Sequence, residues 1–189
     1  HDELRRQRQM CIRDRLLPYN IYMNNKNNVI YLAGGCYWGL EKLLSDLTGV
    51  IETEVGFAGG HIKNVCYKEV TNGDTGHAET VKVYYDPDQI KLHNLLCFFF
   101  KIHNPTTINQ QGNDRGTQYR SVIFYTNDNQ AIIAKEVIQQ VNQSSAWGAP
   151  LVTSIKKFEI FYPAEESHQK YLIKNPNGYS CHFERKLIF

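Results

Sequence analysis

The chain has 189 residues, 42% of them hydrophobic, and a formal net charge of +2. This length predicts one domain with a sizeable core. No apolar run reaches about 18 residues, so the composition argues against a membrane span. Outside the first 22 residues basic and acidic side chains are equal in number, and a neutral body gives no support for nucleic-acid binding.

Residues 1–22 differ from the rest of the chain. Their five arginines stand against three acidic residues, without helical or strand periodicity and without the apolar core of a secretory signal. The run from Gln9 to Arg15 looks more like a translated sequencing adapter than a protein segment. We therefore expect the natural chain to begin near Met23 and residues 23–189 to form the domain. An arginine-rich transit peptide is the alternative, and without a clear targeting signal we expect a cytoplasmic protein.

From Val29 onward, the apolar pattern alternates between strand and helix. Strands are predicted at 29–32, 50–57, 79–85, 119–125 and 152–158, and helices at about 40–47, 86–100, 128–142 and 163–174. Long loops are expected at 58–78 and 103–118, and loops of that length are usually functional or disordered. This order predicts a single α/β domain, an α+β sandwich with one sheet flanked by helices and an irregular C-terminal tail.

A cysteine flanked by glycines lies between the first strand and the first helix, in the run GGCYWG at residues 34–39. A thiol there meets the positive end of the helix dipole and unpaired N–H groups, which favour the thiolate. Tyr37 and Trp38 place an aromatic wall beside the sulfur of Cys36. A lone cysteine at such a turn is more often structural, but this six-residue pattern is more particular.

The five cysteines are scattered, at positions 11, 36, 66, 97 and 181. This spacing predicts no disulfide framework, and without a C-x-x-C pair or a zinc-spaced His/Cys cluster we expect no metal site. Widely spaced cysteines indicate a reducing compartment, in which a functional disulfide would be transient.

Three further stretches place polar residues in or beside loops. They are GDTGHAE at 73–79, QGNDRGTQYR at 111–120, and HQKYL at 168–172 followed by KNPNGY at 174–179. Each is ordinary when taken alone, because a strand-initial Glu is usually solvated and Asn-Asp-Arg-Gly is a common turn. Together with the cysteine run, they resemble in order and spacing the motifs of the A-type peptide methionine sulfoxide reductases, over about residues 29–182.

The resemblance implies a fold with a βαβ core and the thiol-dependent reduction of methionine S-sulfoxide, free or in oxidised proteins, as a repair reaction. It implies Cys36 as the nucleophile, with Tyr37 and Trp38 forming the pocket for the substrate's S-methyl group. Glu79 would be the acid. The hydrogen-bonding partners around the sulfoxide oxygen would be Tyr67, Asp114 and Tyr119.

The chemistry gives these roles a reason. A sulfoxide is a poor electrophile because its oxygen leaves badly, so the site needs a carboxylic acid held neutral near pH 7. Burial against aromatic rings raises the pKa of a carboxyl group in that direction. Attack by Cys36 then releases methionine and leaves a sulfenic acid on the sulfur.

A second thiol must condense with the sulfenic acid, and an external dithiol must reduce the resulting disulfide. We expect Cys181 to be this thiol, because it lies in a tail with Pro176 and Gly178 that can swing toward Cys36. Cys66 is the competitor. No bound cofactor is expected; thioredoxin, or dithiothreitol in the test tube, would serve as the reductant of a monomeric enzyme.

Three departures from the family pattern and two rival functions remain. Tyr37 stands where the family most often has Phe, Cys66 precedes Tyr67 at a position that is not usually Cys, and Cys181 is displaced by one residue from a common spacing.

One rival function is another thiol enzyme, a peroxidase or a papain-like hydrolase with His61 or His77 as its base. The other is a non-catalytic module that binds methionine-containing peptides.

Overall fold

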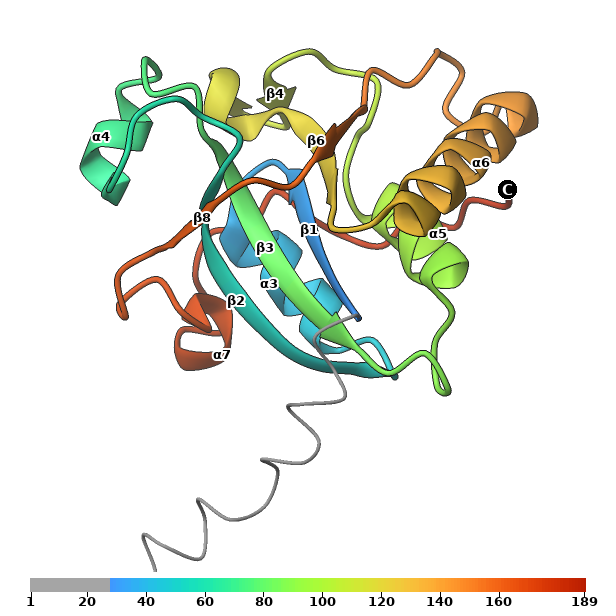
Figure 1. Ribbon diagram of the computed structural model, residues 1–189, viewed down its shortest axis with the longest axis horizontal. Coiled ribbons are helices and arrows are strands. Elements are labelled where there is room, and N and C mark those ends of the chain that lie inside the picture. The colour runs from blue at the N-terminus through green and yellow to red at the C-terminus, as the bar shows by residue number, and fades with distance from the viewer. Residues whose placement is uncertain (1–27) are drawn as a thin grey trace, which may run out of the picture.

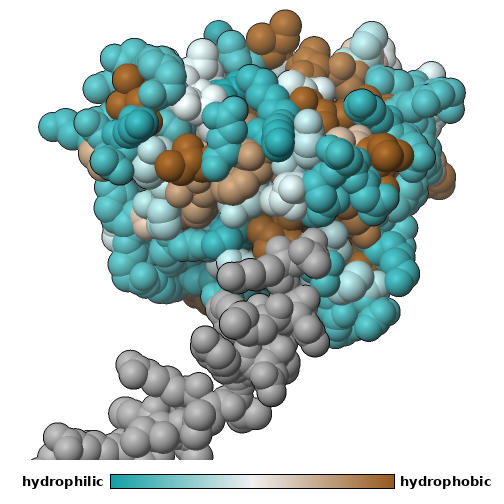
Figure 2. Space-filling model, in the orientation of Figure 1, coloured by the Kyte–Doolittle hydropathy of each residue, from teal (hydrophilic) through white to brown (hydrophobic). Residues whose placement is uncertain are grey.

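The structure is a computed structural model, and it describes residues 28–189. The predicted start of the natural chain near Met23, and the character of residues 1–22, lie outside the described residues. Within the described part, no helix combines the length and the apolar character needed to cross a membrane. On the face seen in Figure 2, hydrophilic side chains predominate and hydrophobic ones form small, separate groups.

Six strands form one sheet in the order β7-β6-β1-β3-β2-β8 (Figure 1). The neighbouring strands are antiparallel except for β6 and β7, which are parallel. The strands are β1 (Val29–Gly34), β2 (Val50–Ala58), β3 (Ala78–Tyr85), β6 (Ser121–Tyr125), β7 (Ser154–Lys157) and β8 (Phe161–Pro163), and a separate two-residue pair is made by β4 (Gln110–Gln111) and β5 (Asp114–Arg115). This mixed sheet confirms the predicted fold class.

Strands β1 and β2 run in the same direction, because both are antiparallel to β3, which lies between them. They are joined by helix α3, so the βαβ unit is split by one inserted strand. The helices are α3 (Tyr37–Ser45), α4 (Tyr67–Thr71), α5 (Leu92–Ile102), the 3-10 helix η2 (Thr117–Tyr119), α6 (Asp128–Ser144) and α7 (Tyr171–Lys174). Helices α5 and α6 pack side by side at one end of the sheet (Figure 1).

Strand β1 is buried along its whole length. Its residues Ile30 and Leu32 belong to the main core, which includes Leu40 of α3 and Phe99 of α5. Alternate residues of the strand, among them Tyr31, belong to a smaller cluster that includes Phe124 and Phe161. Burial on both faces explains why the sequence of β1 is continuously apolar.

The predicted helix over 163–174 is wrong. Strand β8 ends at Pro163, turns follow, and only Tyr171–Lys174 are helical. The side chain of Gln169 bonds the backbone N–H and C=O of Val55, at 2.9 and 2.8 Å, and Lys170 has a left-handed φ of 55°. The left-handed backbone at Lys170 interrupts a helix that would run through it, and the Gln169 side chain ties this segment to β2.

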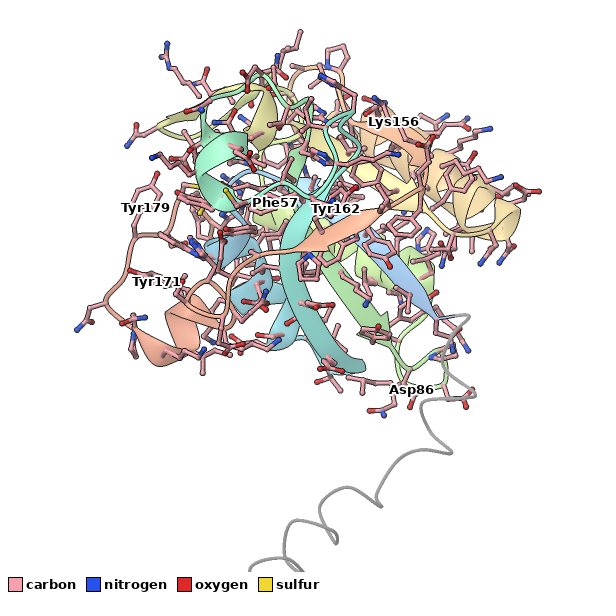
Figure 3. All side chains as sticks on the ribbon, turned by 60° about the vertical axis from the view of Figure 1, so that its left-hand side comes forward. Phe57, Asp86, Lys156, Tyr162, Tyr171 and Tyr179 are labelled. Carbon is pink, nitrogen blue, oxygen red and sulfur yellow. The ribbon has the colours of Figure 1, made fainter. Side chains whose placement is uncertain are left out.

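Other elements also differ from prediction, among them the first predicted helix, which is Tyr37–Ser45, and the strand expected at 152–158, which is Ser154–Lys157. Helix α5 begins at Leu92 instead of Asp86, because the Asp86 carboxylate accepts the Asp88 N–H at 3.0 Å and holds a turn. Tyr119 ends η2, and the strand that was expected to contain it begins at Ser121. The loop predicted at 58–78 contains the short helix α4. Figure 3 shows Phe57 of β2 near Tyr162 of β8, its register partner, and Tyr171 and Tyr179 together at another edge of the molecule.

Candidate active site

Cys36 directly precedes α3, two residues after the end of β1, and is only 8% exposed. The first N–H of the helix, that of Tyr37, donates to Oε2 of Glu79 at 3.0 Å. Glu79 is the second residue of β3, the strand next to β1. One hydrogen bond therefore joins the start of the helix to a carboxyl group 42 residues later in the chain.

No residue with a side chain fits the position of Gly35, the glycine before Cys36. Gly35 has a φ of 102°, and a Cβ placed on it would lie 2.5 Å from Cγ of Gln111. The amide of Gln111 in turn donates to the Gly34 carbonyl at 3.2 Å. The close approach of this side chain fixes the turn that carries the thiol.

The thiol of Cys36 is held neutral in the resting protein. Burial raises its pKa well above its ordinary value, a negative charge on Glu79 raises it further, and the Trp38 N–H acts in the opposite direction. The expectation that the helix dipole would favour the thiolate is thus wrong for the resting state, because desolvation outweighs the dipole.

Glu79 is 1% exposed, and burial raises its pKa to about 8. The Tyr37 N–H lowers this pKa, and the nearby charge of Asp114 raises it. Glu79 is therefore mostly protonated at neutral pH. Since Oε2 accepts a hydrogen bond from the backbone, Oε1 is the oxygen that can carry and donate the proton.

Two tyrosine hydroxyls belong to the same cluster. Tyr67 begins α4 and Tyr119 ends η2, and burial followed by the charge of Glu79 raises the pKa of each. Charges on Cys36 and Asp114 act on both phenols as well. Both hydroxyls remain protonated and can donate hydrogen bonds without adding charge to the site.

Asp114, in β5, makes its side-chain hydrogen bonds to the C-terminal tail. Its Oδ1 accepts the Tyr179 hydroxyl at 3.1 Å, and its Oδ2 accepts the Cys181 thiol at 3.2 Å. Its charge acts on the pKa of Glu79, Cys36 and both tyrosines. Asp114 therefore links the buried acid with the tail.

The tail brings Cys181 into the site without any regular secondary structure after α7. Burial, and then the Asp114 carboxylate, raise the pKa of the Cys181 thiol to about 12, whereas the backbone N–H of Cys36 lowers it. The described cysteines at 36, 66, 97 and 181 are all free thiols. The expected swing of the tail is not needed to bring the thiol near Cys36. Cys66 lies exposed at the start of α4.

Comparison with known proteins identifies the family. The family model of peptide methionine sulfoxide reductase matches residues 28–188. Peptide methionine sulfoxide reductase MsrA 2 of Rhodopirellula baltica is 46% identical over 154 residues, covering 82% of this chain and 89% of that protein. MsrA of Mycobacterium tuberculosis H37Rv is 47% identical over 159 residues, covering 84% and 85%. The chain belongs to the peptide methionine sulfoxide reductase family.

Solved structures agree with this assignment to the reductase family. Reduced Mxr1 from Saccharomyces cerevisiae superposes with a TM-score of 0.76 at 42% identity, covering 84% of this chain and 92% of that one. Methionine sulfoxide reductase A of Corynebacterium diphtheriae gives 0.77 at 41% identity, covering 81% and 77%. Mxr1 in complex with Trx2 gives a TM-score of 0.54 at 26% identity, covering 84% and 89%.

The reductase site contains residues to which the sequence analysis gave no role. Trp38 stacks on Tyr171 with ring centroids 3.8 Å apart, and its Nε1 donates to Nδ1 of His168 at 3.2 Å. The ring of His168 lies 4.3 Å from that of Tyr67. His168 and Tyr171, the two residues without a predicted role, both lie in the run HQKYL, which is the sequence signal that could have indicated them.

A partly buried ion pair between Lys170 and Glu41 holds this run against helix α3. Glu41 of α3 is 1% exposed and accepts the Lys170 N–H at 2.9 Å and the Lys170 Nζ at 3.1 Å. Lys170 Nζ also donates to the carbonyl and the hydroxyl of Thr53 in β2. These bonds fix the aromatic residues on either side of Lys170 against Trp38.

Two side chains that the sequence analysis considered are placed away from catalysis. His77 is committed on both nitrogens, with Nε2 2.8 Å from the Ile62 carbonyl and Nδ1 accepting the Gly60 N–H at 3.2 Å, so it cannot serve as a hydrolase base. His61 is exposed.

The hydroxyl of Tyr37 is buried without a hydrogen-bond partner among the described residues. Nor do those residues include a group of three or more His, Cys, Asp or Glu arranged to hold a metal ion.

Proposed function

We propose that this reductase reduces methionine S-sulfoxide, free or in oxidised proteins, with Cys36 as nucleophile and Glu79 as acid. The observation that carries the proposal is the buried, protonated Glu79 joined through the Tyr37 N–H to the first residue after Cys36. A neutral carboxylic acid beside a thiol is what a sulfoxide requires, because the oxygen must be protonated before the S–O bond breaks.

The first step transfers the oxygen. The Cys36 sulfur attacks the sulfoxide sulfur while Glu79 protonates the oxygen, and the proton of the Cys36 thiol replaces the one that Glu79 gives up. The hydroxyl group then passes from the substrate sulfur to the Cys36 sulfur as the bond between the two sulfurs breaks, so the substrate sulfur is reduced and the Cys36 sulfur is oxidised. Methionine leaves, and the oxygen stays on Cys36 as a sulfenic acid. Atoms and charge balance, so both groups can begin and end this step neutral.

The aromatic residues and hydroxyls provide the binding pocket in this proposal. Trp38, held by Tyr171 and His168, offers an apolar surface for the S-methyl group, and the fully buried ring of Tyr37 packs beside it as the inner wall of this pocket. The hydroxyls of Tyr67 and Tyr119 donate to the sulfoxide oxygen, where negative charge develops. Asp114 orients the tail beside them.

Recycling proceeds through a disulfide between Cys36 and Cys181, which thioredoxin reduces. The contact of Cys181 with Asp114 at the edge of the site supports this pairing over one with Cys66, and the Trx2 complex of Mxr1 supports the reductant. No bound cofactor takes part, and dithiothreitol replaces thioredoxin in vitro. A monomer in the cytoplasm, a reducing compartment, completes the proposal.

A side-by-side assay tests the reaction. The enzyme with dithiothreitol is given methionine S-sulfoxide, hydrogen peroxide or an ester, and the products are quantified. We expect rapid release of methionine and only background rates with the other two substrates. Faster consumption of peroxide, or ester hydrolysis, would assign the site to another thiol enzyme, and binding of methionine peptides without turnover would make it a binding module.

Peptide mapping tests the recycling step. One equivalent of sulfoxide without reductant should convert free Cys36 and Cys181 into a single disulfide. A disulfide between Cys36 and Cys66 alone would transfer the recycling role to Cys66. Cys97, on α5, is the internal control and should stay reduced throughout.

A further inference from the structure

The residue after the recycling cysteine is buried and has one ring nitrogen fixed by the backbone. Nε2 of His182 lies 2.7 Å from the carbonyl oxygen of Gly34, two residues before Cys36. A carbonyl can only accept, so Nε2 carries the hydrogen and donates it. Nδ1 is then the unprotonated nitrogen of a neutral imidazole.

This free nitrogen faces the thiol of Cys181. The distance from Nδ1 of His182 to Sγ of Cys181 is 3.3 Å, and the Asp114 Oδ2 lies 3.2 Å from the same sulfur. The one thiol proton thus has two acceptors within reach. The Ser180 Oγ bonds only the backbone of His182, accepting its N–H at 3.1 Å and donating to its carbonyl at 3.2 Å.

Helix α3 leaves space for the His182 ring at one position, Gly39. A Cβ on Gly39 would lie 2.7 Å from Nδ1 of His182 and 2.6 Å from the Ser180 Oγ. Any side chain there would push the ring off the Cys181 sulfur. The last residue of the GGCYWG run therefore serves the tail as well as the helix.

We propose that His182 is the base that takes the proton from Cys181 when this thiol attacks oxidised Cys36. The inference rests on the proposed recycling through Cys181. The Cys181 sulfur attacks the sulfur of the sulfenic acid, the S–S bond forms and the S–O bond breaks. The Cys181 sulfur is oxidised, the Cys36 sulfur is reduced, and the hydroxide leaves as water with the proton taken from the thiol.

Electrostatics assigns different parts to the two acceptors. Asp114 accepts hydrogen bonds from Tyr179 and Cys181, and its charge raises the pKa of His182, which favours an imidazolium there. Burial lowers the pKa of His182 to about 4, so the ring is neutral at rest; it takes the thiol proton only as the S–S bond forms, when the S–H becomes strongly acidic, and passes it to the leaving hydroxide. Burial and Asp114 keep the Cys181 thiol protonated, so it needs a base in order to attack.

The test separates the two half-reactions in the full-length protein. Reduced enzyme receives one equivalent of methionine S-sulfoxide without reductant in a rapid-quench instrument. Methionine, dimedone-trapped Cys36 sulfenic acid and the disulfide between Cys36 and Cys181 are then quantified by mass spectrometry. His182→Gln keeps an N–H that can reach the Gly34 carbonyl but removes the basic nitrogen.

In His182→Gln we expect an unchanged rate of methionine release, accumulation of the sulfenic acid, and disulfide formation slower by about 10²-fold, the lower range for a general base. Added imidazole should restore the rate in His182→Ala in proportion to its concentration. The matched control is Ser180→Ala, which loses hydrogen bonds within the tail but no base and should form the disulfide within a few-fold of the native rate.

Three results would overturn the assignment of His182. Native disulfide formation in His182→Gln would exclude a base at this position, and slow formation in Asp114→Asn alone would move the role to the carboxylate. Equal slowing in Ser180→Ala and His182→Gln, without imidazole rescue, would make His182 an anchor of the tail. Native enzyme that releases methionine without forming the disulfide between Cys36 and Cys181 would instead overturn the recycling pathway itself, and the role of His182 with it.

Discussion

The two thiols of the site are held by different kinds of structure. Cys36 stands between a fully buried strand and a helix, and its partner Glu79 lies on the adjacent strand. Cys181 stands in a tail without helix or strand and is held by side-chain bonds to Asp114 and by its neighbour's bond to the Gly34 carbonyl. The sheet therefore fixes the first thiol, and a few hydrogen bonds fix the second.

The difference matches what each thiol must do. Oxygen transfer needs an acid and a nucleophile in constant register, which strands that belong to the buried core provide. Recycling requires the second sulfur, which already lies near Cys36, to bond to it and then to present the disulfide to an external dithiol. A segment held by a few hydrogen bonds can open at much lower cost than a core strand.

We call Cys36 with Glu79 the sheet-held half of the site, and Cys181 with its tail the tail-held half. The largest effect is expected from Cys36→Ser, which removes the nucleophile of the sheet-held half. Serine is close in size, so the fold should persist, but a hydroxyl cannot accept the sulfoxide oxygen as a thiol does. We expect no methionine release above background with dithiothreitol, measured beside the circular dichroism spectrum of the variant. Turnover by a correctly folded Cys36→Ser protein would remove Cys36 from the mechanism.

Cys181→Ser removes the recycling thiol of the tail-held half and leaves the sheet-held half intact. This variant should release one methionine per enzyme at the native rate but lose steady-state turnover with thioredoxin. The measurement compares the burst with the steady state, and Cys97→Ser serves as the control that should retain both. Normal thioredoxin-driven cycling in Cys181→Ser would mean that another thiol completes the reaction.

Within the sheet-held half, Glu79→Gln separates acid catalysis from architecture. The amide oxygen can still accept the Tyr37 N–H, but the side chain has no proton to give at neutral pH. A positioned general acid contributes about 10²–10⁴-fold, so single-turnover methionine release should fall by that factor. Alkylation of Cys36 by iodoacetamide should change far less, and equal losses in both assays would indicate that Glu79 merely holds the site together.

The raised pKa of Glu79 should also make the free energy of unfolding depend on pH. The carboxyl of Glu79 titrates at about 8 in the folded protein and near 4.5 when unfolded. Between these values the folded state binds more protons, so its free energy of unfolding falls as pH rises and levels off above about pH 8. Relative to the native protein, Glu79→Gln should gain on the order of a few kcal/mol across this range. Urea melts at pH 5 and 8.5 measure the gain, and parallel curves would contradict the raised pKa.

The smallest expected effect concerns the hydroxyl of Tyr37. It is buried without a partner among the described residues, and an unsatisfied polar group costs about 1–3 kcal/mol. Tyr37→Phe should therefore raise the free energy of unfolding by about 1 kcal/mol, after allowance for the small void left behind. Chemical denaturation measures this, and a clear loss of stability would show that the hydroxyl makes a stabilising contact.

Local pattern in the sequence determined the sheet-held half. An apolar run followed by glycines, a cysteine and a helical repeat places Cys36 at the junction of β1 and α3, and strict alternation places Glu79 at the start of β3. Strands and helices have their own periods, so such positions can be inferred from neighbouring residues alone. The family motifs added the expectation that these distant positions meet.

Only the tertiary structure decided the protonation of Cys36 and the place of the tail. The helix dipole can be inferred from a pattern, but the burial that outweighs it depends on what packs over the thiol. The tail has no period to read, and its position follows from a bond between His182 and Gly34, 148 residues apart in the chain, and one between Cys181 and Asp114, 67 apart. Long-range hydrogen bonds of single side chains leave no local pattern in a sequence, so the partners of an irregular segment emerge only once the chain has folded.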